Sequence, residues 1–358
     1  VFGIPLGRLA DVWNRKNLIS IGLSFWSAMT ALSGFAQNFT HLAVCRFGVG
    51  IGEAGVNPAS HSIIADYFPP RRRAFAMAIL MLGGSLGMML GFVGGGMIAE
   101  AYNWRIALVS VGAPGLLLAV VMARSLREPA RGTFETETPP PPPPILTTAA
   151  TMWANPAMRH LIAGSVVAGL VSYGLTQWLP TFFIRVHDLN QSQTGMLMAG
   201  VFGIPGSIGA LAFGKWFDRL SHRGFQHGIW MLAVVPFATL PFFIAGLLAD
   251  NLVTAIVLFI IPGFAANYVI GPTIAMVQTL SPVQMRAVSS AIMMLCLNLI
   301  GMGLGPLLVG LLSDLLTPHH GEDALSVALA FFTLVGLWGT VHFWLCGRAL
   351  AKQQLDTA

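Results

Sequence analysis

Two ionisable residues, Arg46 and Glu53, lie inside one long apolar stretch, residues 40–67. A charge in the apolar core of a membrane is costly, so such residues are usually functional. Seven positions separate the two, about two helical turns, which places them on one face of a helix together with Asn57. This pattern favours Glu53 as a group that takes up and releases a proton, and Arg46 as a group that holds an anion or a partner carboxylate. The alternative is a structural ion pair, for which an axial rise of about 10 Å is long.

Two short polar segments between apolar stretches carry a second kind of chemistry. Asp11 is followed by Arg15 and Lys16, and Asp218 is followed by Arg219. A carboxylate near the N-terminus of a helix from another part of the molecule can hold one face closed electrostatically. We therefore expect these five residues to act as gate groups on one side of a membrane. The alternative is that the basic residues only set the orientation of the chain.

Neutral polar residues interrupt two later apolar stretches. Tyr173 and Gln177 lie in residues 159–184, and Asn267 lies in residues 252–280. Together with Arg46, Glu53 and Asn57, these three residues are expected to contact a substrate. Hydrogen bonds between helices are the alternative for the three neutral ones. Neither stretch carries a carboxylate or a lysine in its middle, and Phe182 and Phe183 lie nearby, which favours an amphipathic ligand.

The remaining sequence offers no catalytic or metal signature. The three cysteines, Cys45, Cys296 and Cys346, each stand alone in an apolar run, with no CxxC spacing. There is no phosphate-binding loop of the form G-x-x-x-x-G-K-[ST] and no H-E-x-x-H motif. We therefore expect no enzyme activity and no cofactor.

The amino-acid composition indicates whether the chain folds in water or in a membrane. Of 358 residues only 9% are charged and 55% are hydrophobic, whereas a soluble chain is about 25% charged. This excludes a soluble enzyme and a nucleic-acid binder, and it predicts a membrane protein. Ten apolar stretches are long enough to span a bilayer: 18–36, 40–67, 73–99, 104–126, 159–184, 194–217, 227–249, 252–280, 285–316 and 324–347. The apolar opening residues predict an eleventh helix that begins before the sequence does.

The segment 127–158 differs from the other breaks. Six consecutive prolines, residues 139–144, predict a stiff polyproline II spacer inside a linker. Basic residues are retained on the cytoplasmic side of a membrane. Alternate loops hold 16 of the 19 lysines and arginines, including those of the linker and the tail after residue 347. The linker and the C-terminus are therefore predicted to be cytoplasmic. A stripe of glycines at 83, 87, 91 and 95 predicts close packing against another helix.

The two halves of the sequence repeat. Residues 7–11 are echoed 207 positions later by residues 214–218, and Arg73-Ala74 is echoed 213 positions later by Arg286-Ala287. Parallel repeats of this kind are found in major facilitator transporters. The run Gly7-Arg8-Leu9-Ala10-Asp11 through Lys16 resembles that superfamily's signature between its second and third helices. The run Arg46 through Gly52 resembles its fourth-helix signature, R-x-x-x-G-x-G.

The resemblance implies an all-α polytopic fold of two pseudo-symmetric six-helix halves, the first of them lacking helix 1 and the start of helix 2. Residues 1–126 would hold helices 2–6, residues 127–158 the linker, and residues 159–358 helices 7–12 and a short tail. Shorter motifs resemble the spinster-like branch: Gly50 to Ala54, Ile64 to Phe68, Trp104-Arg105 and Arg127 to Gly132. The anion:cation symporters are the rival branch.

The expected function is secondary active transport by alternating access, coupled to protons, of an amphipathic or lipid-like molecule. A symporter of small organic anions bound at Arg46 is the first alternative, and a polytopic membrane enzyme or sensor is the second. The expected partners are a small-molecule substrate, protons and the lipid bilayer, without nucleic acid. We expect a monomer in the cytoplasmic or plasma membrane.

Overall fold

The computed structural model describes residues 5–6, 9–10, 13–131 and 144–357. In this part of the chain every regular element is a helix, which confirms the all-α prediction. Each of the ten predicted spans coincides with one helix or with consecutive helices. The chain divides into two compact units, one of residues 1–138 with 190–196 and one of residues 139–189 with 197–358. The division at residue 138 lies inside the predicted linker.

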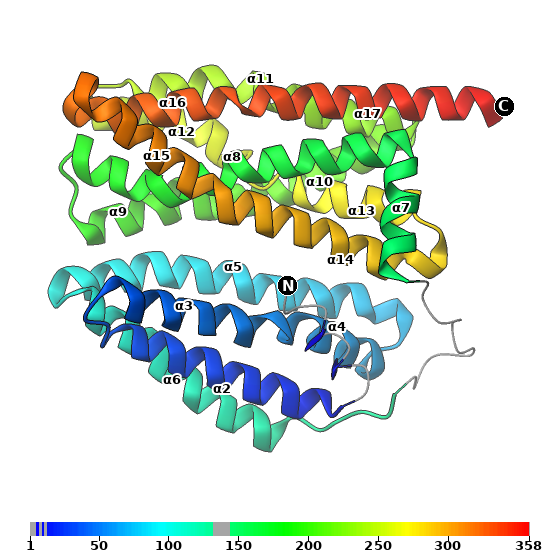
Figure 1. The fold of residues 1–358 in the computed structure, drawn as a ribbon, viewed down its shortest axis with the longest axis horizontal. Helices are drawn as coiled ribbons and strands as arrows, with labels where there is room; N and C mark the ends of the chain where they lie inside the picture. The colour runs from blue at the N-terminus through cyan, green and yellow to red at the C-terminus, as the bar shows by residue number, and fades with distance from the viewer. Residues whose placement is uncertain (1–4, 7–8, 11–12, 132–143, 358) are drawn as a thin grey trace. The chain divides into compact units, whose positions relative to one another are not determined.

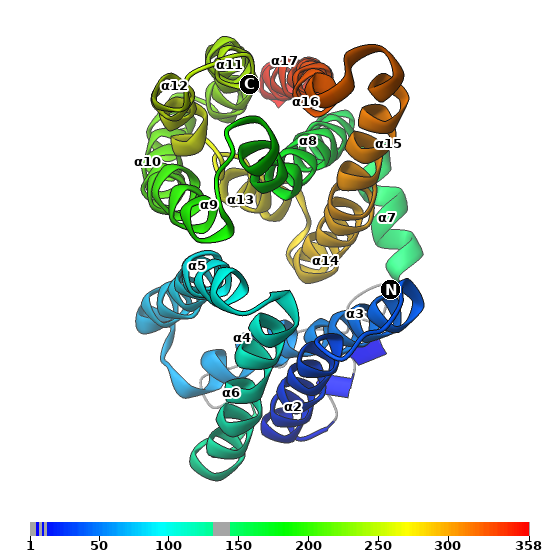
Figure 2. The ribbon, with the colours of Figure 1, turned by 90° about the vertical axis from the view of Figure 1, so that its left-hand side faces the viewer.

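Residues 13–131 of the first unit form α2 (Arg15–Ser33), α3 (Phe39–Ala54), α4 (Val56–Tyr67), α5 (Pro70–Ala101) and α6 (Trp104–Ser125). Figures 1 and 2 show α2, α3, α5 and α6 side by side, with α4 following α3. Asparagine side chains cap three of their starts, because an asparagine oxygen can accept from a free backbone N–H of the first turn. Asn14, Asn38 and Asn103 accept from residues 17, 41 and 106 at 2.8, 2.9 and 3.0 Å.

The second unit begins with α7 (Ile145–Ala154), a helix that the sequence did not predict inside the linker, and in Figure 1 it runs across the direction of α8. The main helices that follow along the chain are α8 (Pro156–Val186), α9 (Gln191–Met198), α10 (Ile204–Ser221), α11 (Phe225–Leu247), α12 (Leu252–Phe264), α13 (Ile270–Leu280), α14 (Arg286–Cys296), α15 (Gly303–His320), α16 (Ala324–Leu334) and α17 (Gly336–Thr357). All of these belong to the second unit except residues 191–196 of α9, which are grouped with the first unit. Residues 139–143 lie outside the described part, so the polyproline II prediction stays a prediction.

Two spans of this unit contain a π-helical segment, η1 (Ala199–Gly203) and η3 (Leu297–Met302). A proline follows each segment within four residues, Pro205 after η1 and Pro306 after η3. Proline has no backbone donor and its ring clashes with the carbonyl four residues earlier, which lies in the π segment in both cases. The wider i to i+5 pattern accommodates that clash without ending the helix.

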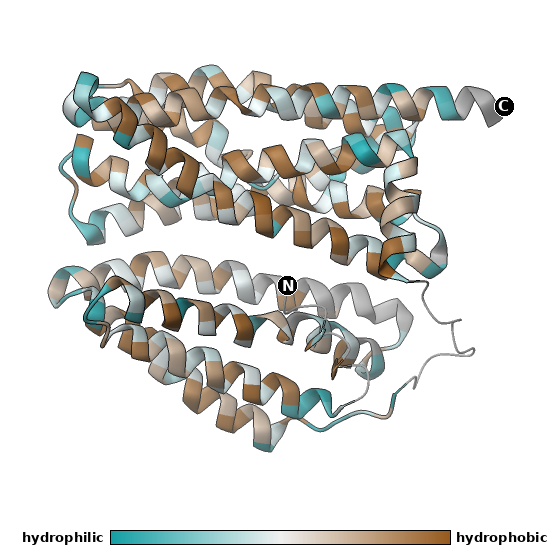
Figure 3. Ribbon diagram, viewed as in Figure 1, coloured by the Kyte–Doolittle hydropathy of each residue, from teal (hydrophilic) through white to brown (hydrophobic). Residues whose placement is uncertain are grey.

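Hydrophobic residues run along the middle of the helices, and hydrophilic residues gather toward their ends (Figure 3). Among the described residues, five helical stretches are long and apolar enough to cross a membrane: Trp104–Ser125, Pro156–Val186, Gln191–Ser221, Phe225–Leu247 and Val288–Gln353. The glycine stripe of α5 does not pack as predicted. A Cβ atom at position 83, 87, 91 or 95 would have no described atom within 4 Å.

Candidate functional site

Helix α3 has one packed face and one open face. Gly48 and Gly52 are buried against α2, where a Cβ atom at Gly52 would lie 2.9 Å from the Cβ atom of Trp26. Arg46 and Glu53 are both exposed, on the opposite side of the helix. No described atom lies within 4 Å of a Cβ built at Gly50, which lies between them. Glycines thus bring α3 close to α2 while leaving the charged face open.

Arg46 and Glu53 do not form an ion pair with each other. The described residues contain two ion pairs within 4.0 Å, and both involve Arg15. The structural pair considered above is therefore absent, and both charges remain available to a ligand or a proton. Asn57 belongs to α4, and its side chain lies outside the described part of the structure.

The span that carries these charges is broken directly after Glu53. Helix α3 ends at Ala54 and α4 begins at Val56, with Gly55 between them. Pro58 explains the position of the break, because its ring clashes with the carbonyl four residues earlier, which is that of Ala54. The break places Glu53 in the last turn of α3, where some backbone carbonyls have lost their helical partners.

A second span is broken in the other unit. Helix α12 ends at Phe264 and α13 begins at Ile270, and Asn267 lies exposed in the turn between them. A Cβ atom at Gly206 of α10 would lie 3.2 Å from the Asn267 amide nitrogen. The structure therefore places Asn267 in irregular backbone, a position that the sequence assigned to a continuous span.

Helix α8 presents Tyr173, half-buried, and Gln177, exposed, four residues apart on one face. Among the described residues, neither side chain nor that of Asn267 has a protein hydrogen-bond partner, and contact of these three residues with a substrate stays a prediction. Trp178 differs, since its indole N–H donates to the Pro306 carbonyl at 2.8 Å.

Phe182 and Phe183, which were expected to lie near the neutral residues and to favour an amphipathic ligand, lie in the core. Both side chains are fully buried. They pack edge-on against each other and against Phe259, with ring centroids 5.1–6.2 Å apart. They contribute to the core of the second unit because edge-to-face aromatic pairs pack well in interiors.

A buried charged cluster lies where α2 begins. Arg15 is 1% exposed, and its guanidinium forms ion pairs with Asp66 and Glu128, the latter at 2.8 Å. It also donates to the Ser62 hydroxyl at 2.8 Å and to the Pro129 carbonyl at 3.1 Å. The planar fork of arginine suits several acceptors at once. Arg15 thereby joins the start of α2, the end of α4 and the segment after α6.

The carboxylate of Glu128 is held by two neighbouring residues. Its second oxygen accepts from the Lys16 backbone N–H at 2.8 Å, at the N-terminus of α2. Burial alone would raise the pKa of Glu128. The Lys16 N–H and the Arg15 guanidinium outweigh that effect and hold its pKa below the ordinary value. Arg131 extends the contact, since its guanidinium donates to the Ala10 and Trp13 carbonyls at 2.9 and 2.6 Å.

The predicted gate residues therefore fall into three groups. Arg15 and the backbone of Lys16 belong to this cluster, whereas Asp11 lies outside the described residues. Asp218 and Arg219 are exposed on α10, and neither has an ion pair among the described residues. Sequence reasoning did not assign Asp66 and Glu128 as partners of Arg15. The available signal was an acidic residue at the end of an apolar span and another at the start of the linker.

Comparisons with known proteins agree with this architecture. The family model described as Major Facilitator Superfamily matches residues 1–306. The chain belongs to the Major Facilitator Superfamily. It is a multi-pass membrane transporter rather than an enzyme, as predicted.

Individual relatives place this major facilitator protein near the spinster branch. It is 29% identical to an MFS-type efflux pump of Mycolicibacterium smegmatis, over all of this chain and 83% of the relative. It is 28% identical to Protein spinster homolog 1 of Xenopus laevis, over 94% of this chain and 69% of the relative. A solved structure of a bacterial homologue of the human lysosomal transporter Spinster, inward-facing and unoccupied, matches the fold with a TM-score of 0.86. That match has 24% identity and covers 98% of this chain and 87% of the other.

Proposed function

We propose that this major facilitator protein is a secondary active transporter that works by alternating access and is coupled to protons. The observation that carries the proposal is the open face of α3. Glu53 is a carboxylic acid without an ion pair among the described residues, inside an apolar span and one turn from a helix break. Arg46 lies on the same face and would oppose protonation of Glu53 until an anion neutralises it.

The substrate class follows from the contrast between charged and neutral groups. Arg46 can pair with an anionic group, whereas Tyr173, Gln177 and Asn267 offer only neutral hydrogen bonds. An amphipathic or lipid-like molecule with a charged head and an uncharged body matches both sets. We expect the transporter to act as a monomer in the cytoplasmic or plasma membrane, with its linker and C-terminus in the cytoplasm.

We place the proposed gate on the cytoplasmic side of the membrane, where the linker and the C-terminus are also expected to lie. Asp11 and Asp218 would each hold this side closed by facing a helix N-terminus, supported by Lys16 and Arg219. Arg15 acts as a positioning residue in this scheme, because all of its described contacts lie within the first unit. Its role is to fix the start of α2, to which Asp11 leads.

Symport of small organic anions is a second candidate. It is favoured by Arg46, whose guanidinium has no ion pair among the described residues and could hold a carboxylate directly. The two candidates differ in whether the apolar body of the substrate contributes to binding.

Uptake into proteoliposomes separates the candidates. The purified protein is tested with lysolipids and with small organic anions, each with and without a pH gradient, beside liposomes without protein. We expect lysolipid movement that depends on the gradient and falls in Arg46→Gln. Gradient-dependent transport of organic anions alone would support the second candidate instead, and transport without any gradient dependence would remove the proton coupling.

A further inference from the structure

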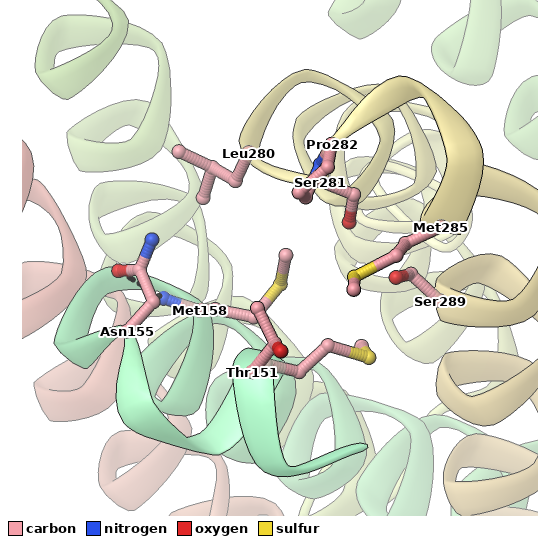
Figure 4. Close-up of a pocket in the computed structure, with 9 residues that line it drawn as sticks. Thr151, Asn155, Met158, Leu280, Ser281, Pro282, Met285 and Ser289 are labelled. Atoms are coloured by element: carbon pink, nitrogen blue, oxygen red, sulfur yellow. Dashed lines mark hydrogen bonds between the residues drawn. The ribbon is translucent and has the colours of Figure 1, made fainter. Parts of the chain in front are cut away.

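A small cavity lies at one end of the second unit, away from the residues discussed above (Figure 4). Its volume is about 150 Å³. Its walls come from α7, from the first turn of α8, and from the loop that joins α13 to α14. All of these segments belong to the second unit, so the cavity is defined without reference to the first.

Two buried hydroxyl groups line this cavity without a hydrogen-bond partner. Ser289 is fully buried and Ser281 is 5% exposed, and neither Oγ atom has a partner in the described structure. Figure 4 shows both hydroxyls directed toward the space between the walls. Buried polar groups are nearly always satisfied in proteins, by protein atoms or by a bound molecule. The two serines therefore leave two buried hydroxyl groups to which a bound molecule could form hydrogen bonds.

Two other side chains of the wall already accept or donate hydrogen bonds. The Thr151 hydroxyl donates to the Thr147 carbonyl at 2.9 Å. The Asn155 side-chain oxygen caps α8 by accepting from the Ala157 N–H at 3.0 Å, and it also accepts from the Gln353 amide at 3.2 Å. Among the hydroxyl groups of the wall, those of Ser281 and Ser289 are thus the ones without a partner in the described structure.

The rest of the wall is apolar and uncharged. Three methionines, Met152, Met158 and Met285, line the space, and Figure 4 shows the side chains of Met158 and Met285 beside it. Methionine is flexible and polarizable, so it adapts to ligands of irregular shape and packs well against aromatic rings. A cavity of about 150 Å³ lined by apolar groups is known to take up a molecule the size of benzene.

We propose that this cavity binds a small uncharged molecule with a benzene-sized apolar body and one hydroxyl group, that is, a ligand of the phenol class. The hydroxyl would bond with Ser281 and Ser289, and the ring would lie among the three methionines. A bound molecule would link the α7–α8 junction to the α13–α14 loop. The inference does not depend on the proposed transport function.

Fluorine NMR of 4-fluorophenol tests the proposal, with the protein in lipid nanodiscs and empty nanodiscs as the reference for partitioning. We expect saturable binding to the protein above the nanodisc background, and weaker binding of fluorobenzene. Ser281→Ala should weaken 4-fluorophenol about five-fold, the value of one ordinary hydrogen bond. The double variant Ser281→Ala/Ser289→Ala should remove the preference for the phenol over fluorobenzene.

Ser326→Ala is the matched control, because its hydroxyl is also buried and unpartnered but lies elsewhere in the second unit. It should bind as wild type does. Thr151→Phe fills the mouth of the cavity from an exposed position and should abolish binding without disturbing the core. Binding that persists in Thr151→Phe, or that falls equally in Ser326→Ala, would overturn the proposal. The absence of saturable binding, with ordered water found on both serine hydroxyls, would also overturn the proposal.

Discussion

The two copies of the loop motif, residues 7–16 and 214–223, differ in their surroundings. Arg15 in the first copy is 1% exposed and paired with two carboxylates. The residue 207 positions later is His222, which is exposed. The residue 213 positions after Asp66 is Thr279, whose hydroxyl donates to the carbonyl of Ala275 in its own helix at 2.8 Å. The second copy therefore keeps the motif's aspartate, Asp218, without the buried cluster.

The two broken spans show the same contrast. The α3–α4 break follows Arg46 and Glu53, whereas the α12–α13 break holds the neutral Asn267. The buried charged cluster and the charged residues beside a broken span thus both belong to the first unit. The residues proposed for coupling, Arg46 and Glu53, therefore lie in the first unit, whereas the residues of the second unit proposed for substrate contact are neutral.

The largest expected effect is the loss of the Arg15 guanidinium. Arg15→Met leaves Asp66 and Glu128 in place without their cation, and breaking a buried pair in this way costs about 3 kcal/mol. His222→Met, at the equivalent position of the second unit, should change stability by less than about 0.5 kcal/mol. Denaturant unfolding of the purified protein in detergent measures both.

The conservative variant Arg15→Lys keeps the positive charge but lacks the planar guanidinium that bonds several acceptors at once. We therefore expect its stability to lie between those of wild type and Arg15→Met. Equal destabilisation by Arg15→Met and His222→Met would show that the two loops are energetically alike, which would break the comparison.

A smaller effect is expected for Glu128, and it depends on pH. Its pKa in the folded protein lies below the unfolded value, so its contribution to stability is fully present above the unfolded value, about 4.3. That contribution is lost as the pH falls through the lowered folded-state value. The difference in melting temperature between wild type and Glu128→Gln should therefore be constant near neutral pH and close in acid. A difference that persists unchanged at pH 3 would argue against the ion pair.

The smallest effect concerns an attempt to install the cluster in the second unit. His222→Arg combined with Thr279→Asp places the first unit's charges at the equivalent positions. Because both sites are exposed, the new pair should add less than about 1 kcal/mol. Thermal melting of the double variant against each single variant gives the coupling energy. A gain of several kcal/mol would show that the second unit already contains the geometry and lacks only the charges.

Much of the fold could be predicted from the sequence, because span positions depend on local composition. The ten apolar stretches coincide with helices, and the seven-residue spacing of Arg46 and Glu53 places both on the open face of α3. Helical periodicity is a local property, so a single stretch is enough to reveal it.

Contacts between distant segments could not be predicted in the same way. Arg15 meets Asp66 across 51 positions and Glu128 across 113, and no local spacing encodes such pairs. The interruption at Asn267 was missed because proline is tolerated inside membrane helices, so Pro262 and Pro272 did not decide where α12 ends. The burial of Phe182 and Phe183 depends on Phe259 of a different helix.

The central claim, that Glu53 carries the coupled proton, is tested most directly by comparing two transport modes in Glu53→Gln proteoliposomes. Glutamine has the size of glutamate and cannot ionise. We predict that Glu53→Gln abolishes uptake driven by a pH gradient while substrate exchange without a gradient continues, and that Asn267→Ala slows both modes alike. Gradient-driven uptake at the wild-type rate in a stably folded Glu53→Gln protein would contradict the account.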